Sequence, residues 1–152
     1  AWPQWRPFML RSPSQFRPGP PPAWGSPAFV AALDEVRQVA RTRTPEQIRL
    51  ARHWATVSAM SEWNRTLVSW LVREGVDDAE AARALALGNV ANYDISIACY
   101  EAKYHYWTIR PSQADSTIAL AEGVGLPNFP AYPSGHACGP AAMATVVGGL
   151  LP

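Results

Sequence analysis

Two short stretches of this 152-residue chain carry residue types that bind an oxyanion. One runs from Pro133 to His136 with the sequence Pro-Ser-Gly-His, so that a hydroxyl, a backbone N–H group and an imidazole follow a proline. Proline fixes φ and glycine tolerates backbone angles that other residues avoid, which predicts a tight turn. A helix starting at about Cys138 to Pro140 would point its unpaired N–H groups and positive dipole end the same way.

The other stretch, upstream of the first, supplies positive charge. Lys103 and Arg110 lie seven residues apart, which is close to two turns of an α-helix. On one helix the two side chains would share a face and bring two cations to one pocket. Lys103 is also the one lysine among 13 basic residues. Two cations, a donor-rich turn and a histidine together predict a phosphate-type site.

Together, the two stretches resemble the signature of the superfamily of type 2 phosphatidic acid phosphatases and vanadium-dependent haloperoxidases. In that signature a lysine is followed, after six residues, by Arg-Pro, and this pattern matches Lys103 to Pro111. The next part is Pro-Ser-Gly-His, which matches Pro133 to His136. Residues 6–18 also resemble the arm that precedes the helical core in bacterial haloperoxidase-like members. The resemblance therefore points to the bacterial haloperoxidase-like branch.

The resemblance implies a role for each residue of the two motifs. It implies that His136 is catalytic, as the general acid of a phosphatase or as the group hydrogen-bonded to vanadate in a haloperoxidase. Histidine suits either role because its pKa lies near neutrality. By the same resemblance the oxyanion, vanadate or phosphate, is bound by Lys103, Arg110, Ser134 and Gly135.

Two aromatic residues near the motifs are candidates for a halide or substrate pocket. Phe129, five residues before Ser134, falls where chloroperoxidase-type members of the family place an aromatic residue of the halide site. Tyr100 is the second candidate. Aromatic side chains usually only pack, so ordinary packing stays an alternative for both. Haloperoxidases of the family commonly have an aromatic residue directly before Arg-Pro, whereas this chain has Ile109, which leaves the halide preference open.

A third block of the family signature, containing Ser-Arg, a histidine and an aspartate, is absent from the chain. Only 16 residues follow His136. In the family this block supplies another arginine and the histidine that attacks phosphorus or ligates vanadium, which would lie beyond Pro152. We therefore expect the chain to be the N-terminal part of a larger domain, whose C-terminal remainder or a second chain completes the site.

Three functions fit these motifs. The first is a vanadate-dependent haloperoxidase, with vanadate as cofactor, which oxidises a halide with hydrogen peroxide. The second is an acid phosphatase that hydrolyses phosphate monoesters in the same pocket without a cofactor. One pocket can serve either chemistry, because phosphoryl transfer passes through a five-coordinate geometry that vanadate adopts readily. The third is a non-catalytic helical module that binds an anion.

Composition argues against several other classes of protein. The formal net charge is +1, which gives no electrostatic reason to expect binding to nucleic acid or to an anionic membrane surface. No run reaches the roughly 18 to 20 apolar residues of a membrane span. The chain shows no signal segment, so the compartment stays open, with secretion and the periplasm included.

The two cysteines, Cys99 and Cys138, do not form a zinc motif, because neither Cys-x-x-Cys spacing nor a cluster of histidine and cysteine is present. They would approach each other if both motif stretches line one pocket. The alternative is that they are two buried thiols of ordinary packing.

Four other ionisable residues lie on predicted helices. Asp94 and Glu101 are the acids nearest Lys103, and each either orients a cation of the site or belongs to a solvated helix face. We expect His53 to be a structural or surface residue. His105 lies two residues from Lys103, which places it on a different helical face from the predicted site.

A proline-rich beginning is followed by helical patterns. Residues 1–26 hold five aromatic residues among many prolines, which predicts an extended arm packed on a globular body. Residues 27–152 predict helices that start after caps at Ser26 and Thr44. Helix formers dominate and strand alternation is almost absent. The predicted fold is an all-α helical bundle with an extended arm, incomplete at its C-terminus.

Overall fold

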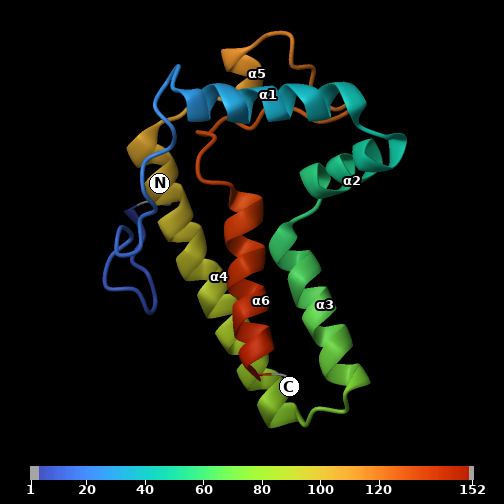
Figure 1. Ribbon diagram of the computed structural model, residues 1–152. Coiled ribbons are helices and arrows are strands. Elements are labelled where there is room, and N and C mark those ends of the chain that lie inside the picture. Colours follow the sequence, from blue (N-terminus) through green and yellow to red (C-terminus); the bar gives the residue numbers. More distant parts are fainter. Residues whose placement is uncertain (1–3, 151–152) are drawn as a thin grey trace. The chain divides into compact units, whose positions relative to one another are not determined.

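The structure, a computed structural model, describes residues 4–150 (Figure 1). No β-strand occurs in that range, which confirms the predicted all-α helical bundle. No helix in the same range is long and apolar enough to cross a membrane. In chain order the helices are α1 (Pro27–Thr42), α2 (Pro45–Thr56), α3 (Ala59–Arg73), α4 (Asp78–Tyr106), α5 (Pro111–Ala114) and α6 (Gly135–Leu150).

α1 and α2 begin where the sequence supplies a cap. The Ser26 hydroxyl accepts a hydrogen bond from the Phe29 N–H group at 3.2 Å, and Pro27 occupies the first helical position. Thr44 forms a capping box with Gln47 at the start of α2. Both predicted helix starts are therefore confirmed.

The chain divides into two compact units. Within the described residues, the first contains residues 4–18, 58–105 and 133–150, and thus α3, most of α4 and α6. The second contains residues 19–57 and 106–132, and thus α1, α2 and α5. Each unit is built from segments that lie far apart in the sequence.

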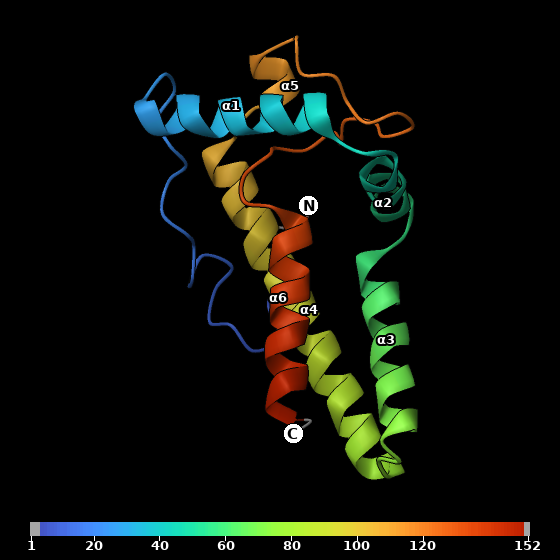
Figure 2. The same cartoon turned by 45° about the vertical axis from the view of Figure 1, so that its right-hand side comes forward.

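α3, α4 and α6 pack around the hydrophobic core of the first unit. They run alongside one another, with α4 directed opposite to α3 and α6 (Figures 1 and 2). Burial of an aliphatic side chain contributes about 1.5–3 kcal/mol, so the packing of these three helices stabilises the unit. The buried core residues are Leu67 and Leu71 of α3, Ala84 of α4, and Met143 and Val147 of α6.

Glycine residues allow α4 and α6 to approach closely. A Cβ atom at Gly88 of α4 would lie 3.2 Å from the Met143 Cε atom, tighter than an ordinary contact. Further along the same two helices, a Cβ atom at Gly139 would lie 3.5 Å from the Asn92 Oδ1 atom. The end of α4 that carries Lys103 is therefore brought toward the start of α6.

A buried carboxylate of α4 holds the arm in the first unit. Asp94 is 5% exposed and accepts hydrogen bonds from three consecutive backbone N–H groups, those of Phe8 at 2.6 Å, Met9 at 2.7 Å and Leu10 at 2.9 Å. Phe8 and Phe16 contribute little packing, because they are 73% and 72% exposed, whereas the Trp5 ring stacks on the Tyr93 ring of α4 with centres 6.4 Å apart. Polar bonds to Asp94 and this one ring contact therefore hold the arm against α4.

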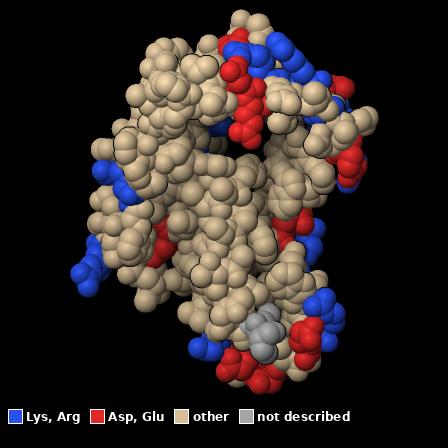
Figure 3. Space-filling view, viewed as in Figure 1, with Lys and Arg blue, Asp and Glu red and all other residues tan. Residues whose placement is uncertain are grey.

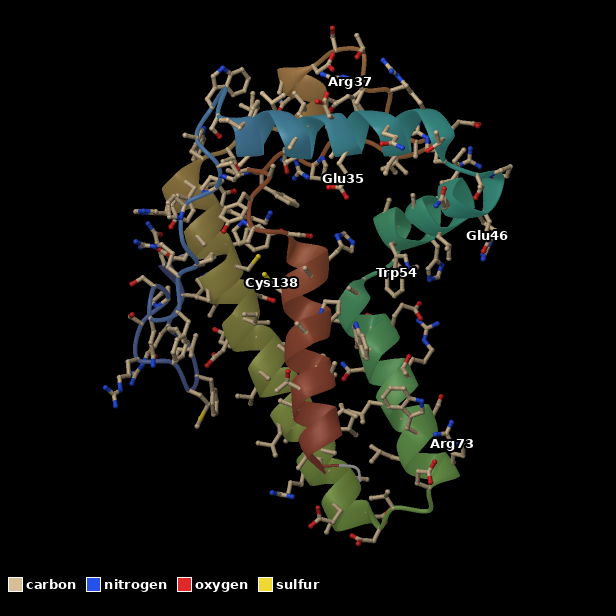
Figure 4. All side chains as sticks on the ribbon, in the orientation of Figure 1. Glu35, Arg37, Glu46, Trp54, Arg73 and Cys138 are labelled. Atoms are coloured by element: carbon tan, nitrogen blue, oxygen red, sulfur yellow. The ribbon has the colours of Figure 1, made fainter. Side chains whose placement is uncertain are left out.

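In the second unit, three arginines hold the segment that follows α5. Arg37 of α1 donates from its Nε atom to the Asp115 Oδ2 atom at 2.7 Å. Figure 3 shows charged side chains gathered over α1 and α2. Arg37 is labelled on α1 in Figure 4. The other bonds run from Arg43 to the carbonyl oxygens of Ala119 and Leu120, and from Arg52 to that of Glu122.

The apolar side chains of α1 and α2 are largely open to solvent in this chain. Neither helix has a buried residue. Val39 and Leu50 are 54% and 42% exposed. Both helices therefore keep apolar side chains at the surface of the described residues.

We expect Asp94→Asn to release the arm. An amide keeps one oxygen acceptor but loses the charge, and a hydrogen bond to a charged group contributes about 1.5–3 kcal/mol. The variant should unfold at lower temperature, and limited proteolysis should remove the arm faster than in the unchanged protein. Asp78→Asn on the exposed start of α4 is the matched control. Equal cleavage rates of the arm in Asp94→Asn and in the unchanged protein would contradict the assigned role of Asp94.

We expect Asp115 to stabilise the fold near neutral pH and to lose this effect in acid. Hydrogen bonds from the Thr117 N–H and hydroxyl groups, and then from Arg37, lower the pKa of Asp115 from 3.8 to about 2. Because the pKa of Asp115 is lower in the folded than in the unfolded protein, its carboxylate stabilises the fold at pH values above the unfolded-state pKa. This stabilisation is lost as the pH falls from about 4 toward 2. Thermal unfolding of Asp115→Asn should therefore show a reduced Tm near neutral pH and a shrinking difference in acid. A difference independent of pH would argue against this coupling.

Candidate oxyanion site

The Pro-Ser-Gly-His motif leads into α6, whose first turn contains Gly135 and His136. The Ser134 carbonyl oxygen accepts hydrogen bonds from the N–H groups of Ala137 at 3.2 Å and Cys138 at 3.0 Å, so the helix begins directly after it, at Gly135. The predicted start at about Cys138 to Pro140 is therefore wrong by at least three residues. Pro140 lies inside the helix instead, where it removes one backbone donor.

This earlier start changes what the motif offers to a ligand. Gly135 and His136 become the first two helical residues, and the N-terminal end of a helix attracts anions through its N–H groups and partial positive charge. Gly135 does not have a positive φ, so the glycine is not required by the backbone angle. A Cβ atom there would meet nothing within 4 Å, so the glycine leaves open space beside the turn.

Lys103 lies in the last turn of α4 and is almost completely buried, with 1% of its surface exposed. It belongs to the same unit as the turn at Ser134. The pKa of Cys138, in the first turn of α6, is lowered to about 7, first by a hydrogen bond from Cys99 and further by the Lys103 ammonium group. The charge of Lys103 therefore acts on the first turn of α6. A buried cation beside the positive end of a helix creates a positive potential that stabilises an anion.

Arg110 does not lie on the helix that carries Lys103. α4 ends at Tyr106, and Trp107 has a φ of 50°, a left-handed conformation that bulky residues rarely adopt. Arg110 precedes α5, where its N–H group donates to the Gln113 side chain. The prediction of one shared helical face is therefore wrong, because the backbone leaves the helix between the two cations. Their convergence in one pocket stays a prediction, since they belong to different units.

The two predicted pocket aromatics pack against neighbours within their own units. In the second unit, the Arg110 Nη2 atom donates to the Phe129 carbonyl oxygen at 3.0 Å, and the guanidinium carbon lies 5.1 Å from the centre of the Phe129 ring. That distance is within the range of a cation–π interaction. In the first unit, the Tyr100 ring lies 6.4 Å from the Tyr104 ring. The structure thus brings Arg110 and Phe129 together, and the halide pocket itself stays a prediction.

Hydrogen bonds to Thr108 join the segment that carries Arg110 to the segment that precedes the Pro-Ser-Gly-His motif. Its carbonyl oxygen accepts from the Ala131 N–H group at 3.0 Å, and its hydroxyl accepts from the Tyr132 N–H group at 2.9 Å. The rings of Tyr106 and Tyr132 pack edge to face, 5.7 Å apart. The sequence reasoning missed Thr108, because nothing in the spacing signals a bond to a residue 24 positions away.

The acids and histidines considered above make contacts with residues that belong to neither motif. Asp94 binds the arm, and Glu101 accepts a hydrogen bond from the Arg17 Nε atom at 3.0 Å. These contacts give no support to the hypothesis that the two acids orient a cation of the site. They also give none to the alternative that the acids lie on a solvated helix face. His105 Nε2 lies 3.4 Å from Arg17 Nη1, and the His53 ring packs against a neighbouring tryptophan, as expected for structural histidines.

The donor set of the first unit fits an oxyanion rather than a metal cation. The Lys103 ammonium group and the N–H groups at the start of α6 only donate hydrogen bonds, and the Ser134 hydroxyl can donate one more. Between residues 4 and 150, no group of three or more His, Cys, Asp or Glu side chains could hold a metal ion. Donors of this kind bind the oxygen atoms of vanadate and of phosphate alike, so these residues fit either anion.

Neither a family model nor a curated protein matches the chain. Among solved structures, the chain is similar to a crystal structure described as that of the first bacterial vanadium-dependent iodoperoxidase, with a TM-score of 0.84 and 29% sequence identity. The match covers 98% of this chain, and the chain spans 41% of the length of that protein. Together with the all-helical fold, this similarity supports the haloperoxidase superfamily as the one to which the chain is related.

Proposed function

We propose that this chain contributes the oxyanion-binding part of a vanadate-dependent haloperoxidase, which oxidises a halide with hydrogen peroxide. One observation supports it most: the buried ammonium group of Lys103 lies near the first turn of α6, in a fold similar to that of a vanadium-dependent iodoperoxidase. The two matched motifs supply these groups, and the comparison favours haloperoxidase chemistry over the alternatives.

Lys103, Ser134 and Gly135 would hold the oxygen atoms of vanadate, with Arg110 as a further cation. When bound, vanadate supplies the chemistry that activates peroxide toward a halide. The contribution of the chain is electrostatic preorganisation, because helix packing fixes the donors before the anion arrives. Charge-assisted hydrogen bonds from lysine and arginine are stronger than those between neutral groups, so the cations supply most of the affinity.

His136 would hold and transfer a proton beside the bound anion. It follows Gly135 in the first turn of α6 and is exposed, so its imidazole can exchange protons with solvent or substrate. Histidine changes its charge near neutral pH, which suits a general acid. His105 contacts Arg17 and His53 packs against Trp54, whereas His136 directly follows Gly135, one of the proposed oxyanion donors.

We propose that residues outside this chain complete the site, either the C-terminal remainder of the domain or a second chain. The similar iodoperoxidase is more than twice as long as the matched region, since this chain spans 41% of it. The open apolar faces of α1 and α2 offer a surface on which such residues could pack. They would supply the third signature block, including its histidine.

An assay on the intact protein separates this function from the two alternatives. The protein is incubated with vanadate, hydrogen peroxide and iodide or bromide, and halogenation of a dye is followed. Vanadate-dependent halogenation supports the haloperoxidase. Hydrolysis of a phosphate monoester, inhibited by vanadate, would replace it with an acid phosphatase, because the same donors bind phosphate. Neither activity would leave a non-catalytic anion-binding module.

We expect Lys103→Met to weaken vanadate binding by about 10-fold to 100-fold, because a hydrogen bond from a charged group contributes about 1.5–3 kcal/mol. Methionine keeps most of the length of the side chain without its charge. The dissociation constant is measured by calorimetry on the intact protein, and thermal unfolding checks that the variant is folded. Arg83→Met, an exposed position of the same helix, is the control. Unchanged affinity in folded Lys103→Met would remove Lys103 from the site.

We expect His136→Ala to lower kcat roughly 100-fold or more, with a smaller change in vanadate affinity, since general acid catalysis contributes about 10²–10⁴-fold. The pH dependence of kcat should also change, because the group that transfers the proton is lost. His53→Ala on the exposed α2 serves as the control and should leave both quantities unaltered. A loss of affinity as large as the loss of kcat would instead make His136 a binding residue.

A further inference from the structure

The two cysteines of the chain meet where α4 and α6 pack together in the first unit. Cys99 lies one turn before Lys103 in α4 and is 3% exposed, whereas Cys138 lies in the first turn of α6 and is half-buried. Both are free thiols, and their side chains are hydrogen-bonded to each other. In Figure 4 the Cys138 sulfur points from α6 toward α4.

The packing of the two helices explains this contact. Gly139, next to Cys138, faces Asn92 of α4, and a Cβ atom there would lie 3.5 Å from the Asn92 Oδ1 atom, an ordinary van der Waals contact. A disulfide needs Cβ atoms about 3.5–4.5 Å apart, and bridges residues whose backbones approach closely. The hydrogen bond between the two thiols places the sulfur atoms that such a bridge would join next to each other.

We propose that Cys99 and Cys138 form a redox-active dithiol, which hydrogen peroxide converts to a disulfide between α4 and α6 beside Lys103. The inference does not depend on the proposed halogenating activity, because it concerns only the two thiols and peroxide. The disulfide would join the helix that carries Lys103 to the helix whose first turn follows Ser134.

The surroundings of the two sulfurs give them different roles. The pKa of Cys138 is lowered, first by the hydrogen bond from Cys99 and further by the positive charge of Lys103. The pKa of Cys99 is raised, first because its proton is held in the hydrogen bond to Cys138 and then because the thiol is buried. Since the thiolate is the nucleophile, Cys138 attacks peroxide and Cys99 reacts second.

The reaction balances in two steps. The Cys138 sulfur attacks one peroxide oxygen, so that an S–O bond forms, the O–O bond breaks and hydroxide leaves to become water after taking a proton. The Cys99 sulfur then attacks the Cys138 sulfenic acid, so that the S–S bond forms and the S–O bond breaks. The second hydroxide takes the Cys99 proton and leaves as water. Two thiols are oxidised, and one hydrogen peroxide is reduced to two water molecules.

The test treats the folded intact protein with one equivalent of hydrogen peroxide and then blocks the remaining thiols with an alkylating reagent. Peptide mapping without reductant should show the peptide that contains Cys99 joined to the one that contains Cys138, with loss of both alkylatable thiols. Dithiothreitol should restore both. Two alkylated cysteines after peroxide, or linkage to other molecules only, would overturn the proposal.

Two single variants test the order of the steps. In Cys99→Ser, Cys138 should stop at the sulfenic acid and be trapped by dimedone. In Cys138→Ser, the buried Cys99 should remain a thiol under the same conditions. Oxidation of Cys99 at an undiminished rate in Cys138→Ser would contradict the assigned nucleophile. The result for the unchanged protein decides the disulfide itself, even if a variant fails to fold.

Discussion

Two buried charges on α4 are the constraint on which the first unit depends. Removing an ion from water costs several kcal/mol unless partners replace the solvent, so each charge dictates what lies beside it. Asp94 is stabilised by hydrogen bonds from three N–H groups of the arm, which fixes residues 8–10 against the helix. Lys103, nine residues further on, lies near the positive end of α6. One buried charge thus holds the arm, and the other favours an anion.

Packing of α4 against α6 makes the second of these effects possible. At Gly88 a Cβ atom would press on the Met143 side chain, 3.2 Å from its Cε atom, and at Gly139 a Cβ atom would already reach contact distance of Asn92, so neither position leaves room for a large side chain between the helices. The close approach brings the last turn of α4 to the first turn of α6. It also brings two thiols into contact, so the proposed oxyanion site and the proposed dithiol would both depend on the same helix pair.

Some of this could be predicted from the sequence because it depends on local chemistry. The helix caps at Ser26 and Thr44 need only neighbouring residues, and the helical class follows from composition and periodicity. The course of the chain after α4 ends at Tyr106 could not be predicted, because the left-handed backbone of Trp107 contradicts the preference of a bulky residue. The contacts of Thr108 and Asp94 join residues far apart in the sequence, so no local pattern reveals them.

The most direct measurement is a crystal structure of the intact protein soaked with vanadate. If the two motifs form one oxyanion site, an anion will lie within hydrogen-bonding distance of the Lys103 ammonium group and the Gly135 N–H group, with Arg110 also contacting it. This result would unite groups that belong to both units. An anion bound elsewhere, or a Lys103 ammonium group paired with a protein carboxylate and touching no anion, would contradict the assignment.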